Sequence, residues 1–128
     1  MDVYMYQAAL FCRECGEKIR AELDAAGERP ADPADDRSYD SDDYPKGPTP
    51  DGGGEADTPQ HCDSEDCRVF LENPLTGDGR YYVVEAVLEA LTDMMKGNIH
   101  AADRPSLQVW APFYGMDTTK GLVEAIDP

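Results

Sequence analysis

The sequence predicts a small α+β fold, in which a two- or three-stranded antiparallel sheet packs against two or three helices and a long acidic loop interrupts the chain. Three features point to it: a β-favouring stretch at residues 3–11, helical spacing of apolar residues at 17–26 and 80–96, and an acidic insert at 28–60. The chain has 128 residues, of which only 41% are hydrophobic. We therefore expect a single domain over 1–128 with a small core.

Two stretches are expected to form strands. Residues 3–11 are rich in aromatic and β-favouring residues and lack Gly and Pro, which predicts one strand that leads into Cys12. Residues 69–72 predict a second, short strand. If this strand pairs with the N-terminal one, the segments around Cys12 and Cys67 come together.

The first predicted helix follows Cys15. Ile19, Leu23 and Ala26 recur at helical spacing from Glu17 onward, and Gly27 is a typical stop signal. The sequence therefore predicts a three-turn amphipathic helix that packs beside Cys15.

The second predicted helix, over 80–96, is the longest element. Thr76 or Asp78 can cap it and Gly97 ends it. Its expected apolar face consists of Val84, Val87, Leu88, Leu91, Met94 and Met95. We expect this face to cover the sheet; the alternative is a partner groove or a dimer seam, for which methionines are well suited.

The C-terminal part predicts one further short helix. Ser106 can cap a helix over 107–114, which Pro112 restricts to a brief or kinked form. The aromatic residues expected to close the core there are Trp110, Phe113 and Tyr114. Residues 117–128 are expected to be a flexible tail.

All four cysteines lie in two short couplets, at 12–15 and 62–67. Two such couplets supply the four sulfur ligands of a closed structural zinc site. Lasting disulfides are not expected in a reducing cytoplasm. The sequence therefore predicts a zinc-stabilised, zinc-ribbon-like domain with structural Zn²⁺ bound by Cys12, Cys15, Cys62 and Cys67.

Two residues beside the couplets have expected supporting roles. Gly16 is expected to adopt a positive φ, which turns backbone N–H groups towards the sulfurs. His61 is adjacent to Cys62, so it is expected to support the metal from behind a ligand or to replace a cysteine.

The insert at 28–60 contains six prolines, four glycines and ten acidic residues, but no Val, Ile, Leu, Met, Phe or Trp. It is therefore expected to be a long mobile loop. Two tyrosines bracket a run of carboxylates in it. These residues are expected to hold the loop onto the folded body or to contact a partner: Tyr39, Asp40, Asp42, Asp43 and Tyr44.

The formal net charge is −16, and no part of the chain is basic. Such a surface repels phosphates, so direct nucleic-acid binding is not expected. We expect a protein partner instead. The sequence has no run of eighteen or more apolar residues, and its first residues lack the features of a secretory signal. We therefore expect a cytoplasmic protein without a membrane partner.

Four motifs together resemble a family of small bacterial and prophage proteins that has no established activity. They are Cys-x-x-Cys-Gly at 12–16, Asp-Tyr-Pro-Lys-Gly-Pro at 43–48, His-Cys-Asp-Ser with a following Cys at 61–67, and Phe-Leu-Glu-Asn-Pro-Leu-Thr-Gly-Asp-Gly at 70–79. The resemblance covers residues 7 to about 90. It implies a cytoplasmic or phage context and a cysteine site.

Three functions are compatible with these features. The first is a non-enzymatic interaction protein of phage or mobile-element type whose zinc is structural. The second is an acidic mimic of nucleic acid that inhibits a host DNA- or RNA-binding protein. The third is a small metalloenzyme, which would need one cysteine position to open for water.

Overall fold

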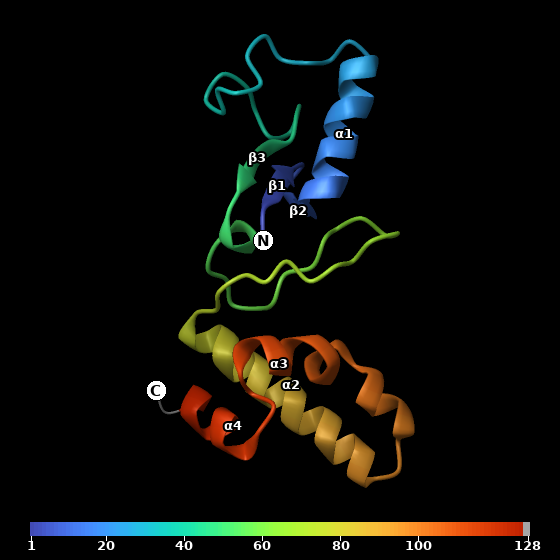
Figure 1. Ribbon diagram of the computed structural model, residues 1–128, viewed down its shortest axis with the longest axis vertical. Coiled ribbons are helices and arrows are strands. Elements are labelled where there is room, and N and C mark those ends of the chain that lie inside the picture. The colour runs from blue at the N-terminus through green and yellow to red at the C-terminus, as the bar shows by residue number, and fades with distance from the viewer. Residues whose placement is uncertain (127–128) are drawn as a thin grey trace. The chain divides into compact units, whose positions relative to one another are not determined.

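The computed structural model describes residues 1–126, which divide into two compact units (Figure 1). The sheet unit comprises residues 1–55 and 60–74, and the helical unit comprises residues 56–59 and 75–126. A three-stranded antiparallel sheet and four α-helices within the described chain confirm the α+β class. The expected single domain stays a prediction, because compactness alone does not test whether the two units unfold together.

The sheet has the strand order β2-β1-β3, with β1 at Val3–Tyr6, β2 at Ala9–Cys12 and β3 at Lys46–Thr49 (Figure 1). The prediction of one strand over 3–11 was wrong, because the chain reverses at Gln7 and Ala8, with φ of 50° and 61°. Two successive positive φ angles form the tight turn that matches the twist of a hairpin. Gly and Asn, the usual residues for such a turn, are absent at these positions, so no residue pattern indicated the turn.

The third strand comes from the insert. Residues 69–72, which were expected to form a strand that pairs with the N-terminal one, do not join the sheet. β3 pairs with β1 through Val3↔Thr49 and Met5↔Lys46, with an irregularity between them. Phe70 makes only an isolated bridge with His61. β3 is an edge strand, where the missing N–H of Pro48 is tolerated. The sheet therefore draws its third strand from a segment without aliphatic residues.

Helix α1 spans Arg13–Ala25 and begins four residues earlier than predicted. Its N-cap is Cys12, whose sulfur accepts a hydrogen bond from the backbone N–H of Cys15. The stop at Gly27 is confirmed, with φ of 79° just beyond the helix. The first cysteine couplet is thus the start of a helix and not a separate turn that precedes it.

Part of the insert is held firmly onto the sheet unit. Tyr44 is buried, with 3% of its surface exposed, and its hydroxyl donates to Asp24 at 2.9 Å. The Arg20 guanidinium lies over the rings of Tyr4 and Tyr44 and donates to the carbonyl oxygen of Pro45 at 2.8 and 3.0 Å. One of the two expected roles of the tyrosines, holding the insert onto the folded body, is therefore observed.

In the helical unit, α2 spans Gly77–Met95, with Thr76 as its N-cap and Gly97 just past its end (Figure 1). The Thr76 side chain accepts from the N–H of Gly79 at 3.0 Å. The helix therefore begins three residues before the predicted start, where the capping residue places it. The short helical turns that follow are η2 (Ile99–Asp103), η3 (Ser106–Trp110) and α3 (Ala111–Tyr114).

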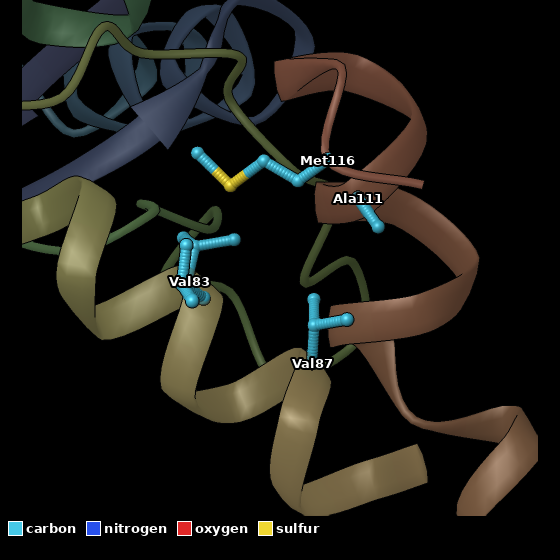
Figure 2. Close-up of a cluster of buried hydrophobic side chains, with 5 residues drawn as sticks. Val83, Val87, Ala111 and Met116 are labelled. Atoms are coloured by element: carbon cyan, nitrogen blue, oxygen red, sulfur yellow. The ribbon is translucent and has the colours of Figure 1, made fainter. Parts of the chain in front are cut away.

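The core of the helical unit is a cluster of Val83, Val84, Val87, Ala111 and Met116. Figure 2 shows two of the α2 valines, Val83 and Val87, facing Ala111 and Met116. The face predicted for α2 was only partly right, since Leu88 is 48% and Met95 is 89% exposed. The apolar residues of α2 occupy a wider arc of the helix surface than the elements packed against it cover. The valines of α2 face these elements, which contribute Ala111 and Met116 to the core. These elements belong to the helical unit, and the expectation that this face covers the sheet stays a prediction.

The C-terminal elements agree in part with the predictions. Trp110 and Tyr114 pack against the core cluster, whereas Phe113 is largely exposed. The α3 helix is brief, as Pro112 predicted. Helix α4 occupies Thr119–Ile126, within the stretch expected to be a flexible tail, because Leu122 and Ala125 on one of its faces pack against the core cluster. The tail's last residues, 127–128, lie outside the described residues. No helix in the described part of the chain combines the length and the apolar character needed to cross a membrane.

Candidate metal centre

The four cysteines converge at one point of the sheet unit. The sulfurs of Cys12, Cys15, Cys62 and Cys67 all lie within 4.8 Å of one another, and Cys12 Sγ is 3.8 Å from Cys67 Sγ. Four zinc–sulfur bonds of about 2.3 Å in a tetrahedron place the sulfurs about 3.8 Å apart. The cluster can therefore bind a metal ion, and its four soft sulfur donors fit zinc.

The first couplet is positioned by the junction of β2 and α1. Cys12 is the last residue of β2 and caps α1, and Cys15 lies in the first turn of the helix. The positive end of the helix dipole therefore lies at these two residues, and it would stabilise the thiolates that a bound metal requires. The strand and the helix together position these two cysteines without any intervening loop.

Gly16 serves packing and not the backbone turn that the sequence suggested. It lies inside α1, buried, and it is not among the residues with positive φ. A Cβ atom there would lie 2.2 Å from Cδ2 of the Tyr4 ring. Glycine therefore allows α1 to approach β1 closely, and the positive φ beside the cluster occurs at Arg68, with a value of 55°.

The second couplet is held to the first by backbone hydrogen bonds. The N–H of Asp63 donates to the carbonyl of Leu10 in β2 at 2.9 Å, and the N–H of Cys12 donates to Cys62 Sγ at 3.4 Å. Cys62 is fully buried. The turn from Ser64 closes through the N–H of Cys67 at 3.0 Å, which brings the exposed Cys67 to the same point. A cation at this point would join segments separated by 50 residues.

Burial and hydrogen bonding act differently on the cysteines. Burial raises the pKa of the Cys12 and Cys15 thiols, which favours their protonated forms when no cation is bound. The backbone N–H of Val69 lowers the pKa of Cys67. Metal binding requires thiolates and so releases protons, which makes the affinity fall as the pH falls.

His61 lies behind the second couplet and outside the cluster of four sulfurs. Its Nδ1 is 2.8 Å from the carbonyl oxygen of Arg68, and its ring stacks at 5.5 Å from Phe70. The side chain thus contacts the backbone directly after Cys67, which suits a supporting role. Replacement of a cysteine ligand by His61 stays a prediction.

The five residues expected to contact a partner differ in their exposure to solvent. Tyr39 and Tyr44 point into the sheet unit, where the Tyr39 hydroxyl accepts from Arg20 at 3.1 Å. Asp40, Asp42 and Asp43 are exposed. A partner contact by these three aspartates stays a prediction, and the tyrosines have a structural role within the unit.

The surroundings of the cysteine cluster were not predicted from the sequence. Phe11, Ile19 and the outer face of α1 line a cavity beside Cys15 and Cys67. Glu14 and Cys15 belong to the wall of this cavity because α1 begins at Arg13. Cysteine is not among the residues that usually cap a helix, so this early start was not predicted. The spacing of Cys15 and Ile19, four residues apart on one helix, could have suggested it.

No family model matches this chain, and no curated protein or solved structure matches it either. The resemblance of residues 7–90 to small bacterial and prophage proteins therefore stays an interpretation of the motifs. The function has to be inferred from the cysteine cluster and its surroundings.

Proposed function

We propose that this protein is a non-enzymatic interaction protein, of the phage or mobile-element type that its motifs resemble, in which zinc has a structural role. The observation that carries this proposal is the closed set of four cysteine sulfurs within 4.8 Å of one another. Structural zinc sites have four protein ligands, whereas catalytic sites keep one position for water. A shell of four cysteines leaves no such position, which argues against a metalloenzyme.

The small apolar core of the sheet unit supports a structural role for zinc. Its buried apolar cluster consists of Val3, Leu71, Cys12 and Cys62, so two of its four members are themselves cysteines of the site. Zinc binding in comparable small units contributes about 10–16 kcal/mol of apparent free energy. Leu10 and Phe11 pack against this cluster, and burial of one such side chain contributes about 1.5–3 kcal/mol, so zinc would be the largest single contribution.

Elemental analysis of the purified protein tests the metal directly. We expect about one zinc ion per chain, because four ligands complete one site. Cys15→Ser and Cys67→Ser should lose this zinc, and His61→Ala should keep it. His100→Ala is the matched control, since His100 lies in the helical unit.

Two outcomes would contradict the proposal. A native protein that contains no zinc and whose cysteines all react at once with a thiol reagent would exclude the site. Loss of zinc in His61→Ala, with zinc retained in Cys67→Ser, would instead make His61 a ligand in place of Cys67 and contradict the four-cysteine shell.

A further inference from the structure

A cavity of about 430 Å³ lies in the sheet unit directly beside the metal centre. We call it the cysteine groove. Three segments line it: Phe11 of β2, one face of α1, and the turn from Ser64 to Cys67. Both Cys15 and Cys67 face into it. The metal would therefore hold two walls of the groove together.

The groove combines an apolar part with carboxylates. Phe11 and Ile19 are half-buried, which leaves part of each side chain open to the groove. Glu14, Glu22 and Asp66 are exposed along its walls, and among residues 1–126 no ion pair or side-chain hydrogen bond engages them. Their charge is therefore available to a ligand.

The charge of the groove is strongly negative. Its three carboxylates face a single cationic residue, Lys18. A zinc ion with four thiolates adds a formal charge of about −2 at the wall formed by Cys15 and Cys67. An anionic ligand such as nucleic acid would be repelled, and a cation with an apolar stem would be complementary in both respects.

We propose that the cysteine groove binds an arginine-bearing, basic segment of a partner protein. This inference rests on the proposed function, because it assigns the partner's chemistry to an interaction protein. The planar guanidinium suits the site better than the ammonium of lysine, because it pairs with carboxylates through two hydrogen bonds and stacks on an aromatic ring such as Phe11. Its methylene stem packs against Ile19, as long basic side chains do on apolar surfaces.

The overall negative charge of the chain requires a matched control for any binding test. Glu14→Gln/Glu22→Gln/Asp66→Asn removes three charges from the groove. Asp40→Asn/Asp42→Asn/Asp43→Asn removes three from the exposed loop, which is the partner surface that the sequence suggested. The two triple variants have equal net charge, so any difference between them reports the groove and not general attraction.

The probe is the fluorescein-labelled peptide Gly-Ser-Leu-Arg-Gly-Arg-Leu-Ser-Gly, titrated with the zinc-loaded full chain and followed by fluorescence anisotropy. We expect saturable binding that weakens by about tenfold or more in the groove variant and by less than about twofold in the loop variant. Peptides in which lysine or uncharged citrulline replaces both arginines should bind more weakly, citrulline the weakest. Ile19→Lys, which places a cation in the groove, should abolish binding.

Three results would overturn the inference. They are no saturation up to about 1 mM protein, the weak end of specific binding, an equal loss of affinity in both triple variants, or a greater loss in the loop variant. Zinc content is measured in every sample, so that the two proposals fail separately. If the protein contains zinc but does not bind the peptide, only the proposal of arginine binding in the cysteine groove is refuted. If the protein lacks zinc but binds the peptide through the cysteine groove, only the proposal of a structural zinc ion is refuted.

Discussion

The sheet unit and the helical unit are stabilised by different means. The sheet unit joins segments that are distant in sequence. Its stabilising contacts are a cysteine cluster, a glycine contact and the half-buried Arg20, which spans two tyrosines. The helical unit buries an apolar cluster from elements that follow one another along the chain, and it contains no cysteine. A unit with few aliphatic residues needs specific long-range contacts, whereas one built from consecutive helices can rely on local packing.

Removal of the metal is the strongest way to test this contrast. A chelator should remove about 10–16 kcal/mol of binding free energy from the sheet unit alone. We expect amide hydrogen exchange to lose protection in β1, β2 and α1, while α2 stays protected. Loss of protection in both units at once would show that they are one cooperative domain, as the sequence suggested.

The converse change removes packing from the helical unit. Met116 is 3% exposed in the core cluster, so Met116→Ala should lower the free energy of unfolding of that unit by about 2–5 kcal/mol. Met95→Ala makes the same change at a site that is 89% exposed and should have little effect. Denaturant unfolding followed by circular dichroism measures both, and zinc content should be unchanged in both. Zinc loss in Met116→Ala would contradict the separation of the units.

A single methyl group tests the close approach of α1 to β1. Gly16→Ala places a Cβ against the Tyr4 ring and should destabilise the sheet unit by about 1–3 kcal/mol, with weaker zinc binding. Gly77→Ala is the control, because it is also a helical glycine and a Cβ there meets nothing within 4 Å. We expect it to be neutral or slightly stabilising. Competition with a zinc-binding dye and thermal unfolding compare the two, and equal effects would show that the Tyr4 contact is unimportant.

Arg20 tests whether the insert is held by specific geometry. Arg20→Lys keeps the charge but loses the two-pronged contact with the Pro45 carbonyl and the planar stacking on Tyr44, which should cost about 1–2 kcal/mol. Arg37→Lys, at an exposed position, is the control. Hydrogen exchange of residues 44–49 should rise in the first variant only. Unchanged exchange there would mean that Arg20 does not anchor the insert.

The smallest expected effect is at alkaline pH in the helical unit. Burial raises the pKa of Tyr114 to about 12 from an ordinary value of 10.0. The neutral phenol is thus favoured in the folded state, so its contribution is fully present below pH 10 and is lost as the pH rises towards 12. Discounted for partial exposure, the loss is about 1 kcal/mol. Unfolding of wild type and Tyr114→Phe at pH 9 and 11 measures it, and an equal pH dependence in both proteins would refute it.

The sequence predicted those features that depend on local chemistry. Cysteine spacing indicated the cluster, Thr76 was a candidate cap, and Gly27 and Gly97 were identified as stops. Each signal is carried by one or two residues whose side-chain or backbone properties have few alternatives. These predictions therefore did not require knowledge of the tertiary structure.

Features that depend on tertiary contacts were missed. The hairpin at Gln7 and Ala8 uses residues that normally avoid positive φ. The pairing of its strands stabilises the turn, and so do hydrogen bonds from Gln7 to the carbonyl oxygens of Ser41 and Asp42 in the insert. β3 lacks aliphatic residues and forms because β1 offers a free edge. The buried face of α2 was displaced towards Val83 because Ala111 and Met116 select it from a broad apolar arc. Propensity and periodicity do not contain this information.

The division of the insert has a practical consequence for protein engineering. Residues 44–49 supply a buried tyrosine and an edge strand, whereas residues 28–38 are exposed except for the half-buried prolines Pro30 and Pro33. Truncation of the whole insert would therefore remove part of the sheet, and shortening it between 28 and 38 would leave the sheet intact. That stretch is also where a tag or a crosslinking handle can be placed, on the same unit as the cysteine groove and without disturbing either wall of it.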